Sequence, residues 1–272
     1  MKILNSLLFV PASRPERYSK AIEAGADGVI IDLEDAVATS DKDAARASLA
    51  AWLNPAHPVL VRINAANTPW FVADLELLAR AGVRAVVLPK AEHTDDVAVA
   101  SKAGNGLPVF PLIESALGFE QRMALAHANN VERLIFGQFD FQADMNMRCN
   151  EEELLPFRAG LVLASRLAGI AAPIDGPCAA IDDTDTLQAD AQRSRRLGFG
   201  GKLCIHPRQV AVVNRCFSPA EDEVDWARRV VEMDAVSGGG AVAVDGKMVD
   251  RPLVLRATRI LAEIEAKRAG DA

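Results

Sequence analysis

The sequence alternates short apolar runs with helix-forming segments, and this order constrains the fold more than any other feature. The apolar runs cover residues 6–11, 28–35, 58–64, 85–90, 108–114 and 133–140, with weaker runs at 172–177 and 201–207. Their nearly continuous apolar character is typical of strands buried on both faces of a parallel sheet. The helix-forming segments between them cover residues 15–24, 41–53, 70–80, 94–103, 116–128, 151–168 and 183–196.

A glycine stands between several of these helices and the strand that follows. It appears in "EAGADGVII", "ARAGVRAVVL", "RLAGIAAPI" and "RRLGFGGKLCI". Glycine at such a position adopts the left-handed backbone conformation that ends a helix. Helix, glycine and strand recur about every 25–30 residues, which is typical of consecutive βα units.

Eight such units predict an α/β chain folded as a (β/α)8 TIM barrel, a fold that typically takes about 250 residues. The alternative is an open, doubly wound sheet. That alternative is disfavoured because no GxGxxG follows the first strand and no GxxxxGK[ST] occurs in the sequence. The motif "GFGGK" at 198–202 has the wrong order for a phosphate-binding loop and is better explained as a turn from helix to strand.

Composition and charge exclude several classes of protein. The 272 residues are 50% hydrophobic and carry a formal net charge of −7, which disfavours a general nucleic-acid binder. No apolar stretch approaches the length of a membrane span, and Asn5 and Ser6 interrupt the N-terminal apolar run, unlike in a secretory signal. The four cysteines are scattered without a CxxC pair, so we expect neither a zinc site nor a disulfide framework, and a cytoplasmic location.

The pattern changes after residue 208, which divides the chain into two parts. Residues 219–236 predict a helix with Pro219 and acidic residues in its first turn, where the helix dipole favours them. A hairpin-like "VDGK" turn and a last helix over 252–267 follow. We therefore expect a barrel over residues 1–215 and a helical extension over 216–272 that packs on its own barrel or on a neighbouring subunit.

Polar side chains lie at the ends of the predicted strands. In chain order they are Asp32, Glu34, Asp35, Arg62, Asn64, Lys90, Glu114, Asp140, Asp175 and His206. In a parallel barrel all strands end at one face, where reactive residues gather. A single acid there commonly caps the next helix or forms half of an ion pair. A ring of several acids together with the basic residues Arg62 and Lys90 instead favours a functional site.

Two of these acids are candidate metal ligands. Glu114 and Asp140 end neighbouring predicted strands, and two carboxylates with room for water and substrate oxygens are the usual ligands of Mg²⁺. The alternative is that Arg62 or Lys90 neutralises them. Arg62 offers a planar fork suited to a substrate carboxylate. Lys90 is a candidate substrate-binding residue, or a Schiff-base amine if its surroundings left it unprotonated.

Three further positions have both a functional and a structural interpretation. Arg14 and Arg17 follow the first strand, where arginines suit phosphate or carboxylate groups, but Arg17 equally suits a solvated first helical turn. His206 precedes a proline and fits a structural role as well as a site role. No GxSxG motif is present, so a serine hydrolase has little support.

Taken together, the motifs resemble the citrate lyase β-subunit and malyl-CoA lyase family, also described as HpcH/HpaI-type aldolases. The resemblance covers nearly the whole chain. It is carried in order by "LFVPASRPER", "GADGVIIDLEDAV", "VRIN", "VVLPK", "PLIES", "FGQFDFQAD", "GFGGKLCIHPRQ" and "DGKMVDRP". The resemblance implies a TIM barrel. It also implies a Mg²⁺-dependent carbon–carbon lyase, usually oligomeric.

The resemblance implies roles for individual residues. Glu114 and Asp140 correspond to the metal ligands, and Arg62 to the arginine that binds the substrate's carboxylate or keto acid. Arg14 falls where a family arginine contacts the acyl carrier. Asp250 matches a C-terminal acid that reaches a neighbouring subunit's site.

The residues do not identify the proton-transfer group, for which Glu34, Asp35 and Asp250 are the candidates. After the metal aspartate, "DFQADMNM" departs from the family's common pattern, so we expect Phe141 and the methionines to reshape the acyl pocket.

The function implied by the resemblance is cleavage of a short 3-hydroxydicarboxyl-CoA thioester, such as malyl-, methylmalyl- or citramalyl-CoA, to acetyl-CoA or a homologue and a 2-oxo acid. Two alternatives remain: the β subunit of a citrate lyase complex acting on citryl carrier protein, and malyl-CoA thioester hydrolysis. A non-catalytic barrel subunit is disfavoured by the retained carboxylates. The expected partners are an acyl-CoA or an acyl carrier protein and further copies of the chain, as a trimer or hexamer.

Overall fold

The computed structural model describes residues 4–148, 151–237 and 242–270. The chain divides into two compact units, one formed by Leu4–Phe217 and the other by the residues from Ser218 onward. Each is described separately below. No helix among the described residues is long and apolar enough to cross a membrane.

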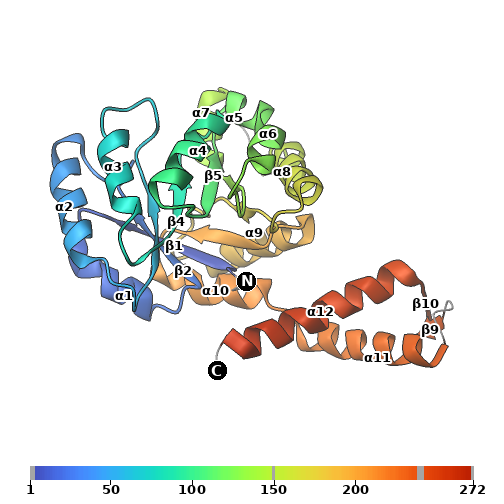
Figure 1. Ribbon diagram of the computed structural model, residues 1–272. Helices are drawn as coiled ribbons and strands as arrows, with labels where there is room; N and C mark the ends of the chain where they lie inside the picture. Colours follow the sequence, from blue (N-terminus) through green and yellow to red (C-terminus); the bar gives the residue numbers. More distant parts are fainter. Residues whose placement is uncertain (1–3, 149–150, 238–241, 271–272) are drawn as a thin grey trace. The chain divides into compact units, whose positions relative to one another are not determined.

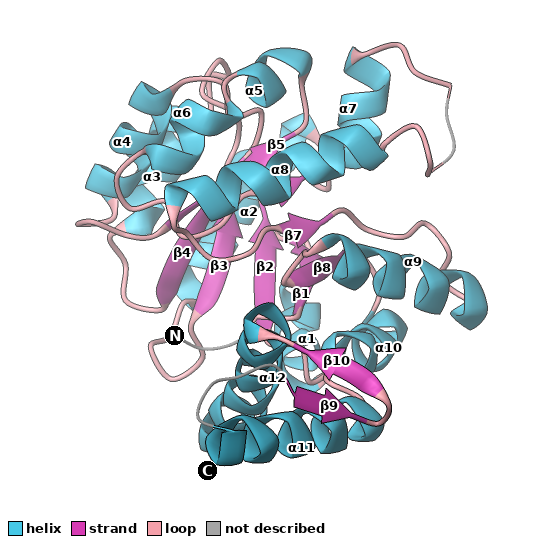
Figure 2. Cartoon of the chain, turned by 90° about the vertical axis from the view of Figure 1, so that its right-hand side faces the viewer, coloured by secondary structure: helices cyan, strands magenta, loops and turns pink. Residues whose placement is uncertain are grey.

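Eight parallel strands close into a barrel in the first unit (Figures 1 and 2). They are β1 (Ser6–Pro11), β2 (Gly28–Asp32), β3 (Val59–Arg62), β4 (Val83–Leu88), β5 (Val109–Ile113), β6 (Ile135–Phe136), β7 (Ile174–Asp175) and β8 (Gly201–Cys204). The ring closes where β1 pairs with β8, with Ser6 opposite Lys202. The predicted TIM barrel is confirmed, and this closing pair excludes an open sheet.

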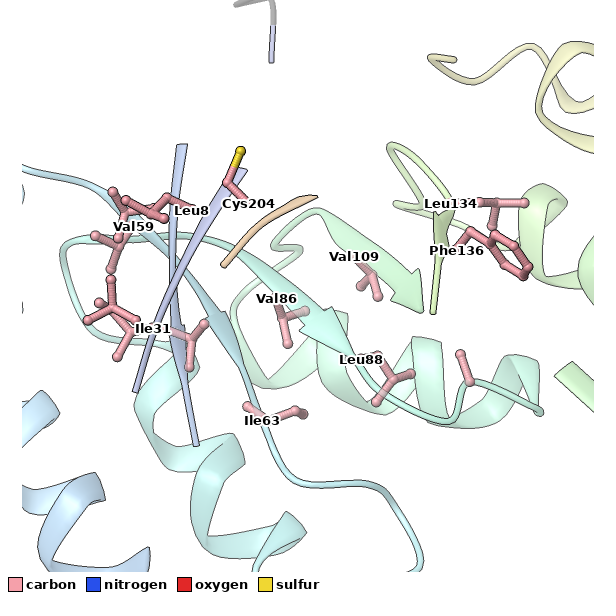
Figure 3. Packing of buried hydrophobic residues seen from close by; sticks show 14 of the residues in the cluster. Leu8, Ile31, Val59, Ile63, Val86, Leu88, Val109, Leu134, Phe136 and Cys204 are labelled. Carbon is pink, nitrogen blue, oxygen red and sulfur yellow. The ribbon is translucent and has the colours of Figure 1, made fainter. Parts of the chain in front are cut away.

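Alternating side chains of the strands fill two separate apolar layers. Leu7, Ile30 and Leu60 belong to the layer inside the barrel. Leu8 and Ile31, their neighbours along the strands, belong to the layer between barrel and helices, part of which Figure 3 shows. Because successive side chains of a strand point to opposite faces, both faces of these strands are buried, as their continuous apolar sequences predict.

Helices cover the outside of the barrel. Two short 3-10 turns, η1 (Pro15–Arg17) and η2 (Thr39–Asp41), precede α1 (Tyr18–Glu23) and α2 (Lys42–Trp52). The others are α3 (Phe71–Leu78), α4 (Thr94–Ala103), α5 (Ala116–Glu120), α6 (Arg122–His127), α7 (Gln138–Asp144), α8 (Leu155–Ala168), α9 (Thr184–Leu197) and α10 (Pro207–Phe217). Gly169 and Gly198 end α8 and α9 with φ angles of 71° and 101°, the left-handed backbone expected of them.

Two helices differ from the sequence-based expectation. The predicted strand over 133–140 ends at Phe136, and the residues that follow form α7. The amphipathic segment after residue 207, which the strand–helix pattern left out, forms α10 and buries Val210 and Val213 against the barrel layer.

The second unit is a pair of helices joined by a hairpin. The helices α11 (Glu221–Ser237) and α12 (Arg251–Gly270) pack against each other, and β9 (Val242–Val244) pairs antiparallel with β10 (Lys247–Val249). Val230, Val249 and Ala257 are part of its own small apolar core. Asp245 in the turn has a φ angle of 50° and Gly246 one of 73°, the backbone that a tight hairpin turn requires.

A buried ion network joins β7 and β8 to the helices outside them. Asp175 accepts hydrogen bonds from Arg158 Nε at 2.9 Å and from Lys202 Nζ at 3.2 Å, and all three side chains are fully buried. Burial alone raises the pKa of Asp175, but the charges of Lys202 and Arg158 outweigh it and hold that pKa at about 2. Asp175 therefore belongs to the barrel's internal scaffold, which corrects its inclusion in the ring of acids at the mouth.

This network predicts a large stability effect. We expect Asp175→Asn to lower the free energy of unfolding by about 3–5 kcal/mol, because it leaves two buried cations short of a counter-charge. Since the folded pKa lies below the unfolded one, Asp175 stabilises the fold above about pH 4, and that contribution is lost between about pH 4 and pH 2. Urea denaturation of the wild type should show this loss, and the variant should show less of it. Asp182→Asn, at an exposed ion pair with Arg208, is the control and should change little.

Candidate functional site

A cavity of about 400 Å³ opens at the carboxyl ends of the barrel strands. Pro11 of β1, Asp32 of β2, Arg62 of β3 and Ile205 after β8 all line it. Of the eight strands, β4 and the turn after it supply no lining residue. The cavity therefore occupies the face where a parallel barrel gathers its reactive side chains.

Glu114 is a buried acid in the lining of this cavity. It follows β5, its side chain is buried, and its Oε1 accepts a hydrogen bond from the backbone N–H of Lys90 at 2.8 Å. Within the described part of the chain it forms no ion pair. Burial, reinforced by the nearby charge of Glu34, raises the pKa of Glu114 to about 8, although the charge of Arg62 opposes this rise. A buried carboxylate without a direct ion pair is energetically costly, and a bound cation would offset this cost.

Asp140 lines the same cavity from a different element than expected. It lies in the first turn of α7, four residues beyond the end of β6, and not on a strand. Its charge also raises the pKa of Glu114, so the two carboxylates are electrostatically coupled. Among described residues Asp140, like Glu114, has no ion-pair partner. Neither Arg62 nor Lys90 forms a direct ion pair with these two carboxylates, although the charge of Arg62 opposes the rise in the pKa of Glu114.

Gly137 lies in close contact with Glu114. A Cβ atom at this position would lie 2.5 Å from Glu114 Cβ and 2.6 Å from Glu114 Oε2, closer than real atoms approach. The absence of a side chain at residue 137 therefore allows the Glu114 side chain to lie against the start of α7.

These residues suit a divalent cation with oxygen ligands. Nowhere in the described chain do three or more His, Cys, Asp or Glu residues form a metal-binding cluster. Glu114 and Asp140 would thus supply two carboxylates and leave the remaining positions for water and substrate oxygens. Mg²⁺ is commonly held in this way, because it retains several waters and takes one or two protein carboxylates.

Arg62 lies beside this carboxylate pair and is itself held rigidly. Its Nε and Nη2 donate to the two carboxylate oxygens of Asp32 at 2.7 and 2.6 Å, and Nη1 lies 2.8 Å from Glu34 Oε2. Its guanidinium also stacks over the Phe9 ring, 4.8 Å from the centroid. A guanidinium has five N–H donors, so donors remain for a ligand carboxylate after these contacts.

Glu34 connects Arg62 to Lys90 by contacting both side chains. Lys90 Nζ donates to Glu34 Oε1 at 2.7 Å, while the buried Glu34 Oε2 lies 2.8 Å from Arg62 Nη1. Burial lowers the pKa of Lys90, but its hydrogen bond to Glu34 outweighs this and raises it. The amine is therefore protonated near neutral pH, which disfavours the Schiff-base alternative. Neither side chain lines the cavity.

The backbone of Lys90 is strained at the point where it contacts Glu114. Its φ angle is 46°, a left-handed conformation that costs a side-chain-bearing residue about 1 kcal/mol or more. We expect Lys90→Gly to be more stable than Lys90→Ala by about 1 kcal/mol, because both lose the ammonium group and only glycine relieves the strain. Urea denaturation of the two variants compares them directly; equal stabilities would contradict a strained backbone at this position.

The other predicted residues lie in different surroundings. Asp35 lines the cavity and is exposed, 3.8 Å from Arg62 Nη1. Arg14 is exposed outside the cavity lining, 3.9 Å from Glu16. His206 Nδ1 accepts the Arg208 backbone N–H at 3.2 Å, a structural role at the start of α10. Asp250 immediately precedes α12 in the second unit.

Sequence reasoning missed several lining residues and misassigned one. Phe141 does not reshape the cavity, because it is buried among the aromatic rings of Phe119, Phe136 and Phe157. Its neighbour Phe139 lines the cavity instead. The apolar sequence predicted a strand here, and on a strand Phe139 and Phe141 would share one face. On the helix α7 they do not, because side chains two residues apart on a helix point in different directions.

Gln138, at the start of α7, was also missed. Its Nε2 donates to the Pro177 carbonyl at 3.1 Å, and its Oε1 accepts from Arg158 of the buried ion network. Gln138 thereby ties the first turn of α7, which carries Asp140, to the barrel's scaffold. Its position directly after a glycine and two residues before a candidate ligand was the one available signal.

Comparisons with known proteins follow this geometry. Residues 5–207 match the family model described as HpcH/HpaI aldolase/citrate lyase. The citrate lyase subunit beta of Leuconostoc mesenteroides is 32% identical, over 99% of this chain and 96% of that protein. The (3S)-malyl-CoA thioesterase of Cereibacter sphaeroides is 33% identical, over 96% and 94%.

Solved structures give the same result. The chain is similar to the protein CitE from Mycobacterium tuberculosis in complex with magnesium, acetoacetate and coenzyme A, with a TM-score of 0.85 and 34% identity over 95% of this chain and 97% of that one. The citrate lyase beta subunit of M. tuberculosis complexed with oxaloacetate and magnesium has a TM-score of 0.72 and 34% identity, over 79% and 96%.

Proposed function

The chain belongs to the HpcH/HpaI aldolase/citrate lyase family, and on this premise we propose that it is a Mg²⁺-dependent carbon–carbon lyase that cleaves a short 3-hydroxyacyl thioester. The observation that carries the proposal is the coupled pair Glu114 and Asp140, which share one cavity without an ion-pair partner among the described residues. The magnesium in the related M. tuberculosis structures supports the same cation here.

The reaction breaks the bond between C2 and C3 of the thioester. Removing the proton of the 3-hydroxyl group lets that oxygen become the carbonyl of a 2-oxo acid, while the electron pair of the broken bond forms the thioester enolate. A proton delivered to C2 then gives acetyl-CoA or a homologue. Mg²⁺ held by Glu114 and Asp140 would supply a Lewis acid for the oxygens of the 2-oxo acid.

The chain's own side chains would bind and orient the substrate. Arg62 would bind the carboxylate adjacent to the reacting carbon, and its two contacts with Asp32 would fix its direction. Glu34, which contacts Arg62 and Lys90, and Asp35, which lines the cavity, are the candidates on this chain for proton transfer. Asp250 would join them if a neighbouring copy brings its second unit to the cavity, in a homo-oligomer such as a trimer or hexamer.

The substrates we favour are malyl-, methylmalyl- and citramalyl-CoA. The similarity to citrate lyase beta subunits keeps a second candidate, cleavage of citryl carrier protein within a complex. The similarity to malyl-CoA thioesterase keeps a third, in which water attacks the thioester and releases CoA. Arg14, which is exposed just after β1, and Lys90, which lies outside the cavity lining, remain candidates for binding the acyl carrier. We propose a cytoplasmic location, because the four cysteines are scattered without a CxxC pair.

One assay separates these candidates. The purified chain is incubated with Mg²⁺ and each of the three acyl-CoA substrates, and acyl-CoA, free CoA and 2-oxo acid are measured. A lyase releases acetyl-CoA or propionyl-CoA with an equal amount of 2-oxo acid, whereas a thioesterase releases free CoA. Cleavage of none of these substrates by the chain alone, but of citryl carrier protein with partner subunits, would contradict the favoured function.

A further inference from the structure

The charged and apolar side chains that line the cavity indicate which kind of 2-oxo acid the site binds. We infer that this site binds 2-oxo acids with a single carboxylate and an uncharged remainder, such as pyruvate. It discriminates against 2-oxo acids with a second carboxylate, such as oxaloacetate. This inference rests on the proposed function. The inference depends on which charges and which apolar side chains face the cavity.

The charges in the cavity leave no partner for a second carboxylate. Its lining contains four acids, Asp32, Asp35, Glu114 and Asp140, and among the described residues one cation, Arg62. Arg62 already contacts Asp32 through two donors and Glu34 through a third. Its remaining donors, together with a metal ion, can serve one carboxylate and the adjacent keto oxygen.

Lys90, the next cation, is not available for this role. It is absent from the cavity lining, and its Nζ is 2.7 Å from Glu34 Oε1. Recruiting it would leave Glu34, which is buried, with a weaker counter-charge.

The rest of the lining is largely apolar. Phe139 and Ile205 are 46% and 41% exposed, and both line this cavity. Phe9, Leu112 and Leu203 extend the surface towards the barrel interior. A methyl or ethyl group packed here would be removed from water, whereas a carboxylate would lose its hydration without gaining a cation.

Binding to Mg²⁺-loaded protein tests this directly. Isothermal titration calorimetry compares pyruvate, 2-oxobutyrate and freshly prepared oxaloacetate. The last two differ in the group attached to C3, a methyl in one and a carboxylate in the other. We expect oxaloacetate to bind at least about 100-fold more weakly than 2-oxobutyrate.

A charge added to the apolar wall should reverse part of this preference. Phe139→Arg should strengthen oxaloacetate binding at least about tenfold without strengthening 2-oxobutyrate binding. Leu117→Arg, an exposed position on α5 outside the cavity lining, adds the same charge elsewhere and should leave both affinities unchanged.

The outcomes separate this inference from the proposed function. Oxaloacetate binding as tightly as 2-oxobutyrate would overturn the inference and leave the lyase proposal standing. Failure of all three acids to bind in the presence of Mg²⁺ would overturn both.

Discussion

Glu114→Gln should abolish Mg²⁺-dependent turnover and leave the metal-free fold at least as stable as the wild type. Glutamine keeps the shape of the side chain but removes the charge that binds the cation. We expect Mg²⁺ affinity to fall at least about 100-fold and thioester cleavage at least about 1000-fold. Calorimetry with Mg²⁺ and a steady-state assay measure the two effects.

The stability effect has the opposite sign because the carboxylate is buried close to the charge of Glu34, and burial outweighs the opposing charge of Arg62. The pKa of Glu114, about 8 in the fold, lies above its unfolded value of about 4.3. Protonation of Glu114 therefore favours the fold, and the metal-free wild type loses stability as pH rises between these two values. The variant lacks this loss, so in EDTA the difference in unfolding free energy should move in its favour from pH 5 to pH 8.

An acid outside the cavity is the matched control. Glu120 is exposed on α5, so Glu120→Gln should leave Mg²⁺ affinity, turnover and the pH dependence of unfolding unchanged. A Glu114→Gln variant that bound Mg²⁺ and cleaved thioester like the wild type would remove Glu114 from the site.

Arg62→Lys should cost at least about 100-fold in kcat/KM, although it keeps the positive charge. A single ammonium group cannot span both oxygens of Asp32, approach Glu34 and still bind a substrate carboxylate, as the guanidinium can. We expect the loss to appear mainly as weaker binding of the 2-oxo acid, together with a destabilisation of about 1–3 kcal/mol from the weakened buried contacts.

The control for this substitution is Arg80→Lys. Arg80 follows α3 and donates one long hydrogen bond, 3.4 Å, to the Ala50 carbonyl oxygen, so its replacement should change neither kcat/KM nor stability appreciably. Unchanged 2-oxo acid affinity in Arg62→Lys would contradict the assignment of Arg62 as the carboxylate-binding residue.

The sequence was sufficient to predict the barrel because its signals are local and repeated. Buried strands such as Val59–Arg62 read as continuous apolar runs, and glycines such as Gly198 mark the ends of helices. Glu114 and Arg62 could be anticipated at the mouth because each directly follows or ends such a run. Parallel order then brings these residues to one face, whatever the details of the loops.

The remainder depends on contacts between distant segments. The run "RLIFGQFD" reads as one strand, yet it turns into α7 after Gly137, where Glu114 of the preceding strand fills the space that a side chain would need. The buried pairing of Asp175 with Arg158 and Lys202 likewise joins residues from three elements. Neither a local propensity nor a spacing rule encodes such contacts, so Asp175 was assigned to the mouth and Phe139 was overlooked.

The central claim is that Glu114 and Asp140 together hold one divalent cation at the barrel mouth. Crystals grown with Mn²⁺ in place of Mg²⁺ test it most directly, because the anomalous signal of manganese locates the ion independently of the refined side chains. We expect a single strong peak within about 2.3 Å of an oxygen of each carboxylate. A peak at other residues, or two carboxylates turned away from each other and paired with Arg62 and Lys90, would contradict the claim.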